Sequence, residues 1–113
     1  MSSFSEKGLL GELEQLVLLA VLRLNEGHAP AVREEILDRT GVELARGSVY
    51  VTLDRLDRKG YLDSWFGDPT PERGGKSKRL FRVTAAGRRA LSQSEQALAR
   101  MRAGLGSLSR SRQ

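Results

Sequence analysis

The sequence predicts a mainly α-helical domain with one small β-hairpin, an α+β fold. The apolar residues Val49, Leu53 and Leu56 are spaced four and three apart, which places them on one face of a helix whose other face is polar and basic. Two strand-like runs follow, separated by a segment rich in glycine and basic residues. This layout is typical of a winged helix-turn-helix, in which the helix contacts DNA bases and the hairpin, or wing, contacts phosphates.

Length and charge agree with a small domain that binds an anion. The chain has 113 residues, enough for one domain with a modest core, and a formal charge of +5. The positive charge is concentrated: residues 48–89 hold ten Lys or Arg and five Asp or Glu, whereas residues 1–47 hold five and eight. A basic excess on the predicted helix and hairpin favours a nucleic acid as the partner over a solvated surface.

The sequence offers little for catalysis or for a membrane. There is no cysteine, which excludes disulfides, a thiol nucleophile and a cysteine-bound zinc, and His28 is the only histidine. The run Gly75-Lys76-Ser77 is not a P-loop, because the first glycine of that motif would fall at Thr70. We therefore expect no enzyme activity, no cofactor and no metal. The apolar run of residues 16–22 is too short to span a bilayer and no signal peptide is evident, so we expect a soluble cytoplasmic protein without a membrane partner.

The first predicted helix runs from Leu9 to about Asn25, after a frayed segment at residues 1–8. Its middle, Leu16–Leu22, is apolar all the way round, whereas a surface helix should be apolar along one stripe only. This helix must be covered on two sides. One small domain is expected to cover one side, which leaves the other for a second chain.

The helix-turn-helix follows. A second helix is predicted at residues 29–40, with Pro30 in its first turn, and then a short extended piece at residues 42–44 as a candidate edge strand. Ser48 is the expected N-cap of the third helix, and Gly60 is expected to end it in a left-handed conformation.

The wing and the last helix complete the chain. Strands are predicted at residues 61–68 and 78–83, with a turn at residues 69–77 between them. Thr84 is expected to cap a helix of residues 85 to about 104, and the Ser/Arg-rich tail from residue 107 is expected to be disordered. The expected division is a DNA-binding domain at residues 1–84, a dimerisation helix at residues 85–106 and a basic tail at residues 107–113.

The last helix predicts dimerisation. Leu91, Leu98 and Leu105 are seven apart, with Met101 in a complementary position, which is the spacing of a short coiled-coil seam. Packing this seam against the first helix of a second copy would cover both excess apolar surfaces and place two recognition helices about 10 base pairs apart, or a multiple of that. The residues predicted to form the dimer interface are Leu13, Leu16, Val17, Leu91, Leu98, Met101 and Leu105.

The DNA-binding prediction centres on the third helix. Arg55 suits guanine O6 and N7, and Val51 suits a thymine methyl group. The sequence leaves the roles of two aromatic residues open. Tyr50 is suited either to contact a phosphate or to pack on the second helix. Trp65 is suited either to stack on a partner or to pack within the fold. The residues predicted to contact DNA are Ser48, Tyr50, Val51, Thr52, Arg55, Arg73, Lys76, Lys78 and Arg79.

Three segments resemble the PadR family of transcriptional regulators. They are LGELEQLVLLAVL at residues 10–22, GSVYVTLDRLDRKGYL at residues 47–62 and GGKSKRLFRVTAAG at residues 74–87. The most specific feature is Tyr-x-x-Leu-x-x-Leu-x-x-x-Gly combined with a glycine-rich wing that ends in Thr-x-x-Gly. The chain is similar to the short subfamily, which has a single C-terminal helix.

The resemblance implies a homodimeric winged-helix DNA-binding protein, usually a repressor, that is often released by a small molecule bound at the dimer interface. The sequence departs from the family pattern at two places: Val51 replaces a frequent proline, and His28-Ala29 stand where Tyr-Gly is frequent. Neither change affects the expected fold, and both bear on the operator and the effector.

Sequence and resemblance together predict a homodimeric transcriptional regulator, a repressor, that binds double-stranded DNA at a pseudo-palindromic operator. The alternative is a winged helix that serves only protein–protein contacts, which would lack salt-sensitive binding to DNA. An RNA-binding protein would need more exposed aromatic side chains than a chain with 5% aromatic residues supplies. An enzyme is the weakest reading, because no catalytic constellation is present.

Overall fold

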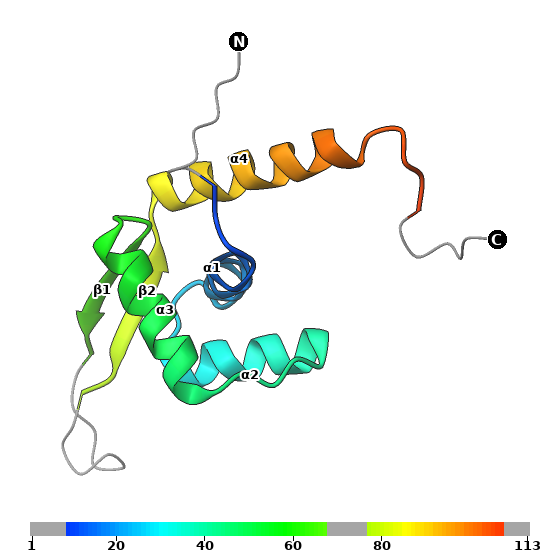
Figure 1. Ribbon diagram of the computed structural model, residues 1–113. Helices are drawn as coiled ribbons and strands as arrows, with labels where there is room; N and C mark the ends of the chain where they lie inside the picture. The colour runs from blue at the N-terminus through cyan, green and yellow to red at the C-terminus, as the bar shows by residue number, and fades with distance from the viewer. Residues whose placement is uncertain (1–8, 68–76, 108–113) are drawn as a thin grey trace.

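The computed structural model describes residues 9–67 and 77–107 and has the α+β architecture that the sequence predicts. The elements in chain order are α1 (Glu12–Leu24), α2 (Ala29–Thr40), α3 (Arg46–Arg58), β1 (Leu62–Phe66), β2 (Arg79–Val83) and α4 (Ala85–Arg102). Figure 1 looks along α1, which lies in the middle of the molecule with α4 on one side, α2 on the other and α3 with the sheet on a third.

The core forms around α1, which contacts α2, α3, α4 and β2. Val17, Leu18 and Val21 are fully buried there and pack in one cluster with Leu53 and Phe81 from α3 and β2. The expectation that one chain covers only one side of the first helix is therefore wrong, because four elements of the same chain surround it. What remains open is a narrow strip that includes Leu19, which is exposed.

The ends of α3 show one corrected and one confirmed prediction. The helix begins at Arg46 with Ala45 as its N-cap, so Ser48 lies inside the first turn and is not the cap. At the other end Gly60 has a φ of 82°, its N–H donates to the carbonyl of Asp57, and the N–H of Tyr61 donates to the carbonyl of Leu56 over 2.9 Å. This pair of bonds closes the helix as a Schellman motif, which needs a left-handed residue at the glycine.

The wing is a two-stranded antiparallel sheet in which Leu62 pairs with Val83 and Phe66 with Arg79. Residues 42–44 form no strand, so the edge-strand prediction is wrong. Instead Gly27, in the loop after α1, exchanges two backbone hydrogen bonds with Phe81 and extends the base of the sheet. The predicted turn at residues 69–77 lies outside the described residues except for its last member, as do the frayed start at residues 1–8 and the tail beyond residue 107.

Thr84 and Gly87 attach α4 to the rest of the fold. The Thr84 hydroxyl accepts from the N–H of Gly87 and donates to the carbonyl of Gly60 over 2.7 Å, so it caps α4 as predicted and also ties it to the end of α3. Gly87 lies so close to Tyr61 that a Cβ atom would stand 2.3 Å from its carbonyl oxygen. The Thr-x-x-Gly sequence is thus the docking point of the last helix.

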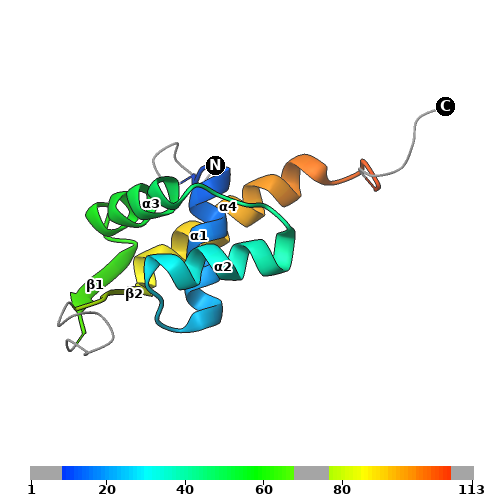
Figure 2. The ribbon, with the colours of Figure 1, turned by 90° about the horizontal axis from the view of Figure 1, so that it is seen from below.

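One face of the first half of α4 is buried, whereas the end of the helix is exposed. Leu91 is buried against its own chain, whereas Leu98 and Met101 are 43% and 77% exposed. Figure 2 shows the end of α4 extending away from the other helices. Because the helix ends at Arg102, Leu105 lies beyond it and does not continue the predicted seam.

Replacing Gly87 with alanine is expected to destabilise the fold by about 2–3 kcal/mol, since the new methyl group meets a backbone carbonyl that cannot rotate away. Gly47→Ala is the matched control, because a Cβ at that helical position meets nothing within 4 Å, and it should raise stability by up to about 1 kcal/mol. Urea unfolding followed by circular dichroism measures both. Equal stability of the two variants would contradict the docking role of Gly87.

Candidate nucleic-acid interface

The outer face of α3 is a solvent-exposed surface beside the wing. Tyr50, Val51, Asp54, Arg55 and Arg58 line a shallow groove of about 200 Å³ along it. Val51 is 54% exposed although it is apolar, and the Tyr50 ring is also exposed. An apolar side chain in the middle of a polar helix face is suited to contact a thymine methyl group.

Thr52 does not belong to this face, which corrects the sequence analysis. Its side chain is 2% exposed, and its hydroxyl donates to the carbonyl of Ser48 over 2.7 Å. Thr52 lies three residues after Val49 and four before Leu56, so helical periodicity turns it toward the core. Its hydroxyl is engaged within the helix and cannot reach a base edge, while Ser48 itself is exposed in the first turn.

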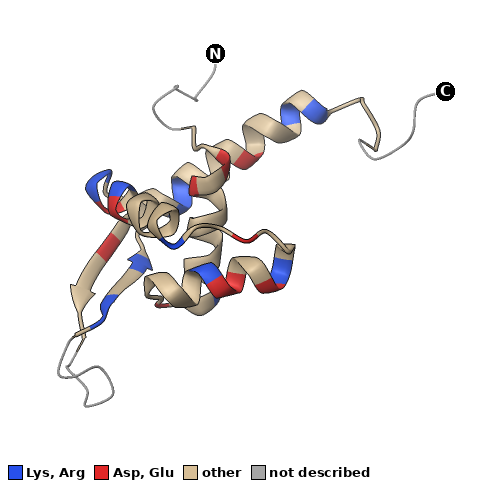
Figure 3. Cartoon of the chain, turned by 60° about the horizontal axis from the view of Figure 1, so that its bottom comes forward, with Lys and Arg blue, Asp and Glu red and all other residues tan. Residues whose placement is uncertain are grey.

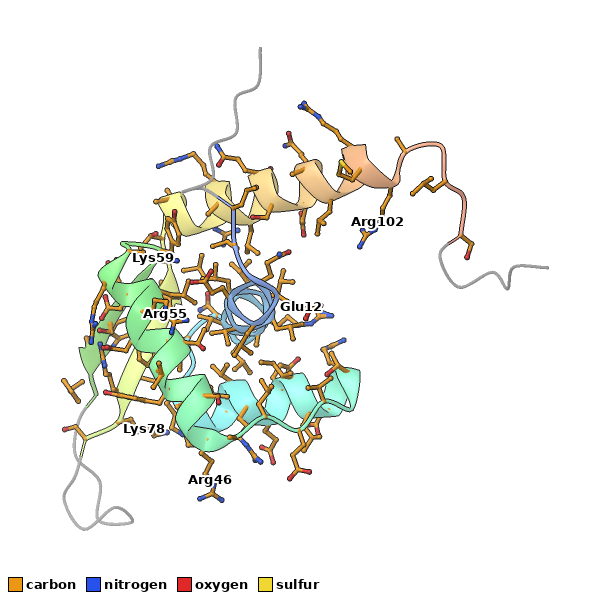
Figure 4. All side chains as sticks on the ribbon, in the orientation of Figure 1. Glu12, Arg46, Arg55, Lys59, Lys78 and Arg102 are labelled. Carbon is orange, nitrogen blue, oxygen red and sulfur yellow. The ribbon has the colours of Figure 1, made fainter. Side chains whose placement is uncertain are left out.

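Two arginines of α3 keep their charge available. Arg55 lies in the middle of the helix (Figure 4), is exposed on the outer face, and has no ion pair among the described residues. Arg46, at the first position of α3, points away from the molecule. Arg46 was absent from the predicted site because the expected N-cap, Ser48, lies three residues after the observed N-cap, Ala45.

A second hollow separates the start of α2 from the start of α3. It has a volume of about 440 Å³ and is lined by both apolar and charged residues. Its lining residues are His28, Ala29, Pro30, Ala31, Arg33, Glu34, Leu37 and Arg46. The hollow extends the exposed surface of α3 onto α2.

Arg79 is not the exposed wing residue that the sequence analysis expected. Its side chain is only 19% exposed and lies over the Phe81 ring, 4.9 Å from the ring centroid. Its guanidinium donates to the Tyr50 hydroxyl over 2.8 Å, to Asp57 over 2.6 Å and to Asp54 over 3.3 Å. Alternation along β2 explains the position, because residues two apart share a face of the sheet and Phe81 is in the core.

These contacts balance most of the charge where the wing meets α3. Burial alone would lower the pKa of Arg79, but its hydrogen bonds to Tyr50, Asp57 and Asp54 raise the pKa above its ordinary value, so the guanidinium stays charged. Asp54 also pairs with Arg58 over 2.6 Å. Among the described residues near the wing and α3, the unpaired cations are then Arg46, Arg55 and Lys78.

Both arginines of β2, Arg79 and Arg82, are paired with acidic residues, so the charge on this strand is largely balanced. Figure 3 shows Lys and Arg on β2 and at the end of α4, whereas α2 carries both signs. Arg73 and Lys76, which the sequence analysis assigned to the wing, lie outside the described residues. Lys78 stands just before β2 and is half-buried.

The other face of the wing gives Trp65 a structural role. The guanidinium of Arg82 stacks over the Trp65 ring at 5.3 Å from its centroid and pairs with Glu26 in the loop after α1. Trp65 and Arg82 therefore pack on the sheet face opposite to Arg79. This favours packing over stacking on a partner for Trp65.

Glu14 anchors the end of α3 to α1. Its buried carboxylate accepts from the Lys59 ammonium over 2.7 Å and from the N–H of Gly11 over 2.9 Å. Burial would raise the pKa of Glu14, but these two hydrogen bonds and the charges of Lys59 and Arg55 outweigh it and lower the pKa. This pair could not be predicted from the sequence, because nothing local links positions 14 and 59.

Glu14→Gln is expected to cost about 1 kcal/mol of stability at neutral pH, since Lys59 loses its ionic partner but is partly exposed. A lowered native pKa means that the carboxylate stabilises the fold above its ordinary value of 4.5 and that this contribution disappears as the pH falls through the native value. The gap between wild type and variant should close in acid. Thermal unfolding across pH measures it, with Glu12→Gln as the exposed control; a gap that stays constant into acid would contradict the ion pair.

Other kinds of site find no support in the part of the chain that the structure describes. Within residues 9–67 and 77–107 no cluster of three or more His, Asp or Glu side chains is placed to hold a metal ion. None of the helices described there is long and apolar enough to cross a membrane.

In the residues that the structure describes, four helices and a two-stranded wing, with α3 exposed beside the wing, define a winged-helix protein. The family model of the transcriptional regulator PadR-like family matches residues 18–93, so the chain belongs to this family, as its sequence predicted. PadR-like proteins are transcriptional regulators and not enzymes.

Individual relatives agree with the assignment. Transcriptional regulator Rv3488 of Mycobacterium tuberculosis is 37% identical over 76 residues, a match that spans 66% of this chain and 64% of that protein. A PadR family regulator from Eggerthella lenta is 25% identical, with a TM-score of 0.66 over 89% of this chain and 88% of its own. F93 from STIV, a winged-helix DNA-binding protein, shares the fold at 15% identity, with a TM-score of 0.62 over 80% of this chain and 90% of its own.

Proposed function

We propose that the protein is a homodimeric repressor that binds a pseudo-palindromic DNA site through α3 and the wing. The observation that carries the proposal is the outer face of α3, where an exposed apolar side chain and unpaired arginines stand beside the wing and its unpaired Lys78. Membership of a family of transcriptional regulators supports it. A small molecule at the dimer interface is the proposed means of release.

Within this proposal, different residues of α3 and the wing contact bases and phosphates. Val51 and Arg55 lie four residues apart on the outer face, so they can approach neighbouring base pairs in the major groove. Arg46 and Lys78 both lie near the end of this face where α3 begins (Figure 4), and both are suited to phosphates. Ser48 can contribute to either, and Arg73 and Lys76 remain proposed phosphate contacts of the wing.

Arg55→Ala is expected to weaken specific binding by about 1–3 kcal/mol and to relax the preference for one base pair in each half-site. Selection of binding sites from random DNA, followed by titration of the selected sequence, measures both effects. Arg39→Ala is the control, since it removes the same charge at the far end of α2. An Arg55 variant with the wild-type site preference would contradict the assignment of this residue to a base.

The homodimer is proposed from apolar surface that this chain leaves open. Leu98 and Met101 have little of their own chain against them, and Leu16 and Leu19 lie on the strip of α1 that stays accessible. Glu12 marks the same strip and points away from α3 in Figure 4. The interface therefore shifts from the predicted set: Val17 and Leu91 are buried within their own chain and offer no surface, whereas Leu13 and Leu16 are half-buried.

Replacing both Leu98 and Met101 with Asp is expected to give a folded monomer, because both side chains are already exposed in the single chain. Dimerisation would have to bury the new charges, which is costly. Sedimentation velocity reports the change, and DNA affinity should fall with it. Gln96→Asp, two residues from Leu98 and thus on another side of α4, is the control. A double variant that remains a dimer would remove α4 from the interface.

A further inference from the structure

We propose that Arg79 is a positioning residue: it holds the Tyr50 hydroxyl so that its hydrogen is directed to a DNA phosphate, and does not bind the phosphate itself. This inference rests on the proposed DNA-binding function. It assigns to the wing a role in aiming a side chain of α3, in addition to any contact that the wing makes with DNA.

The geometry places Arg79 between the wing and α3. Nη1 donates to the Tyr50 oxygen over 2.8 Å, and Nη2 donates to Asp57 over 2.6 Å and to Ser64 over 3.2 Å. The guanidinium also lies 5.7 Å from the centre of the Tyr50 ring. With contacts on both strands and on α3, and with most of its surface covered, this side chain has a single orientation.

The Tyr50 hydroxyl is left with an unused hydrogen. A phenol carries one O–H donor and accepts through its lone pairs, and Arg79 can only donate, so their bond must use a Tyr50 lone pair. No acceptor for the Tyr50 hydrogen occurs among residues 9–67 and 77–107, and the ring is exposed. A hydroxyl that accepts from a cation becomes a better donor, and an anionic oxygen is its best partner.

The charges around Arg79 argue against a direct phosphate contact by its own side chain. Asp54 and Asp57 both pair with it, so a phosphate that approached the guanidinium would meet two carboxylates. The donors that face these carboxylates are already engaged. Tyr50 is the one partner of Arg79 that is neutral and exposed, so it is the route by which Arg79 can affect DNA.

The position of Tyr50 favours a phosphate over a base edge. Tyr50, Asp54 and Asp57 are spaced four and three apart and share the flank of α3 that faces the wing, whereas Val51, Arg55 and Arg58 share the outer face. Phosphates border the major groove in which the outer face of a recognition helix lies. The contact should then strengthen binding to all sequences alike.

A double-mutant cycle on the full chain tests the proposal, using the DNA site selected by the wild-type protein. Tyr50→Phe removes the hydroxyl, and Arg79→Met removes the guanidinium while keeping an apolar stem over Phe81. Each single variant is expected to bind about 10-fold more weakly or worse, and the double variant about as weakly as Tyr50→Phe alone. Arg79→Lys, which retains a donor, should recover part of the loss.

Controls separate positioning from a general effect of charge or stability. Arg82→Met removes the same charge from the opposite face of the same strand and should leave affinity close to wild type. Thermal unfolding must show that each variant is folded at the temperature of the titration. The dependence of affinity on salt should keep its slope in Arg79→Met, because a phosphate-binding arginine would reduce that slope by about 1.

Four results would overturn the proposal. They are wild-type affinity in Tyr50→Phe; losses that add in the double variant; a reduced salt slope in Arg79→Met; and a change of base preference in Tyr50→Phe, which would indicate a base contact. Failure of the wild-type protein to bind any DNA would instead reject the proposed function on which the inference rests, so the two failures are distinguishable.

Discussion

The burial of α1 is the constraint on which the rest of the structure depends. Its apolar residues face α2, α3, α4 and β2, so all four of those elements pack against one central helix. In a chain of this size a central helix gives four short elements one shared core. The position of α3, and with it the proposed DNA-binding surface, follows from packing on α1.

Polar contacts then fix α3 and α4 relative to α1. The Glu14–Lys59 pair holds the end of α3 against α1, and the N–H of Leu10 donates to the buried Ser94 hydroxyl of α4. Thr84 links the start of α4 to the end of α3. α3 is therefore connected to α1 and α4, the two elements that carry the proposed dimer surface. In a dimer, the distance between the two copies of α3 would then be set by how α1 and α4 pack across the interface.

The sequence predicted the elements well because local patterns determine them. The spacing of Val49, Leu53 and Leu56 gave α3, Gly60 gave its end, and Thr84 gave the start of α4. The errors arose where distant residues decide. Ser48 failed as a cap because α3 begins two residues earlier, and Gly27 replaced residues 42–44 at the sheet because backbone pairing with Phe81 has no side-chain signature.

The site was harder to predict than the fold for the same reason. Exposed arginines such as Arg55 follow from helical periodicity, but the pairing of Arg79 with Asp54 and Asp57 depends on how the wing folds back on α3. Thr52 shows the remaining difficulty, because a polar residue type concealed a buried position that its spacing from Val49 already indicated. The sequence shows which residues are polar, but only the packing shows which of them are exposed and free to contact a partner.

The central claim is that α3 and the wing present a positively charged surface to DNA, and salt dependence tests it most directly. Titration of the wild-type protein against its selected site should show affinity falling roughly 10³- to 10⁵-fold between about 50 and 200 mM salt, if a dimer neutralises about six to ten phosphates. Binding that stays constant over this range, or no binding to DNA at low salt, would contradict the account and favour a winged helix that serves protein contacts.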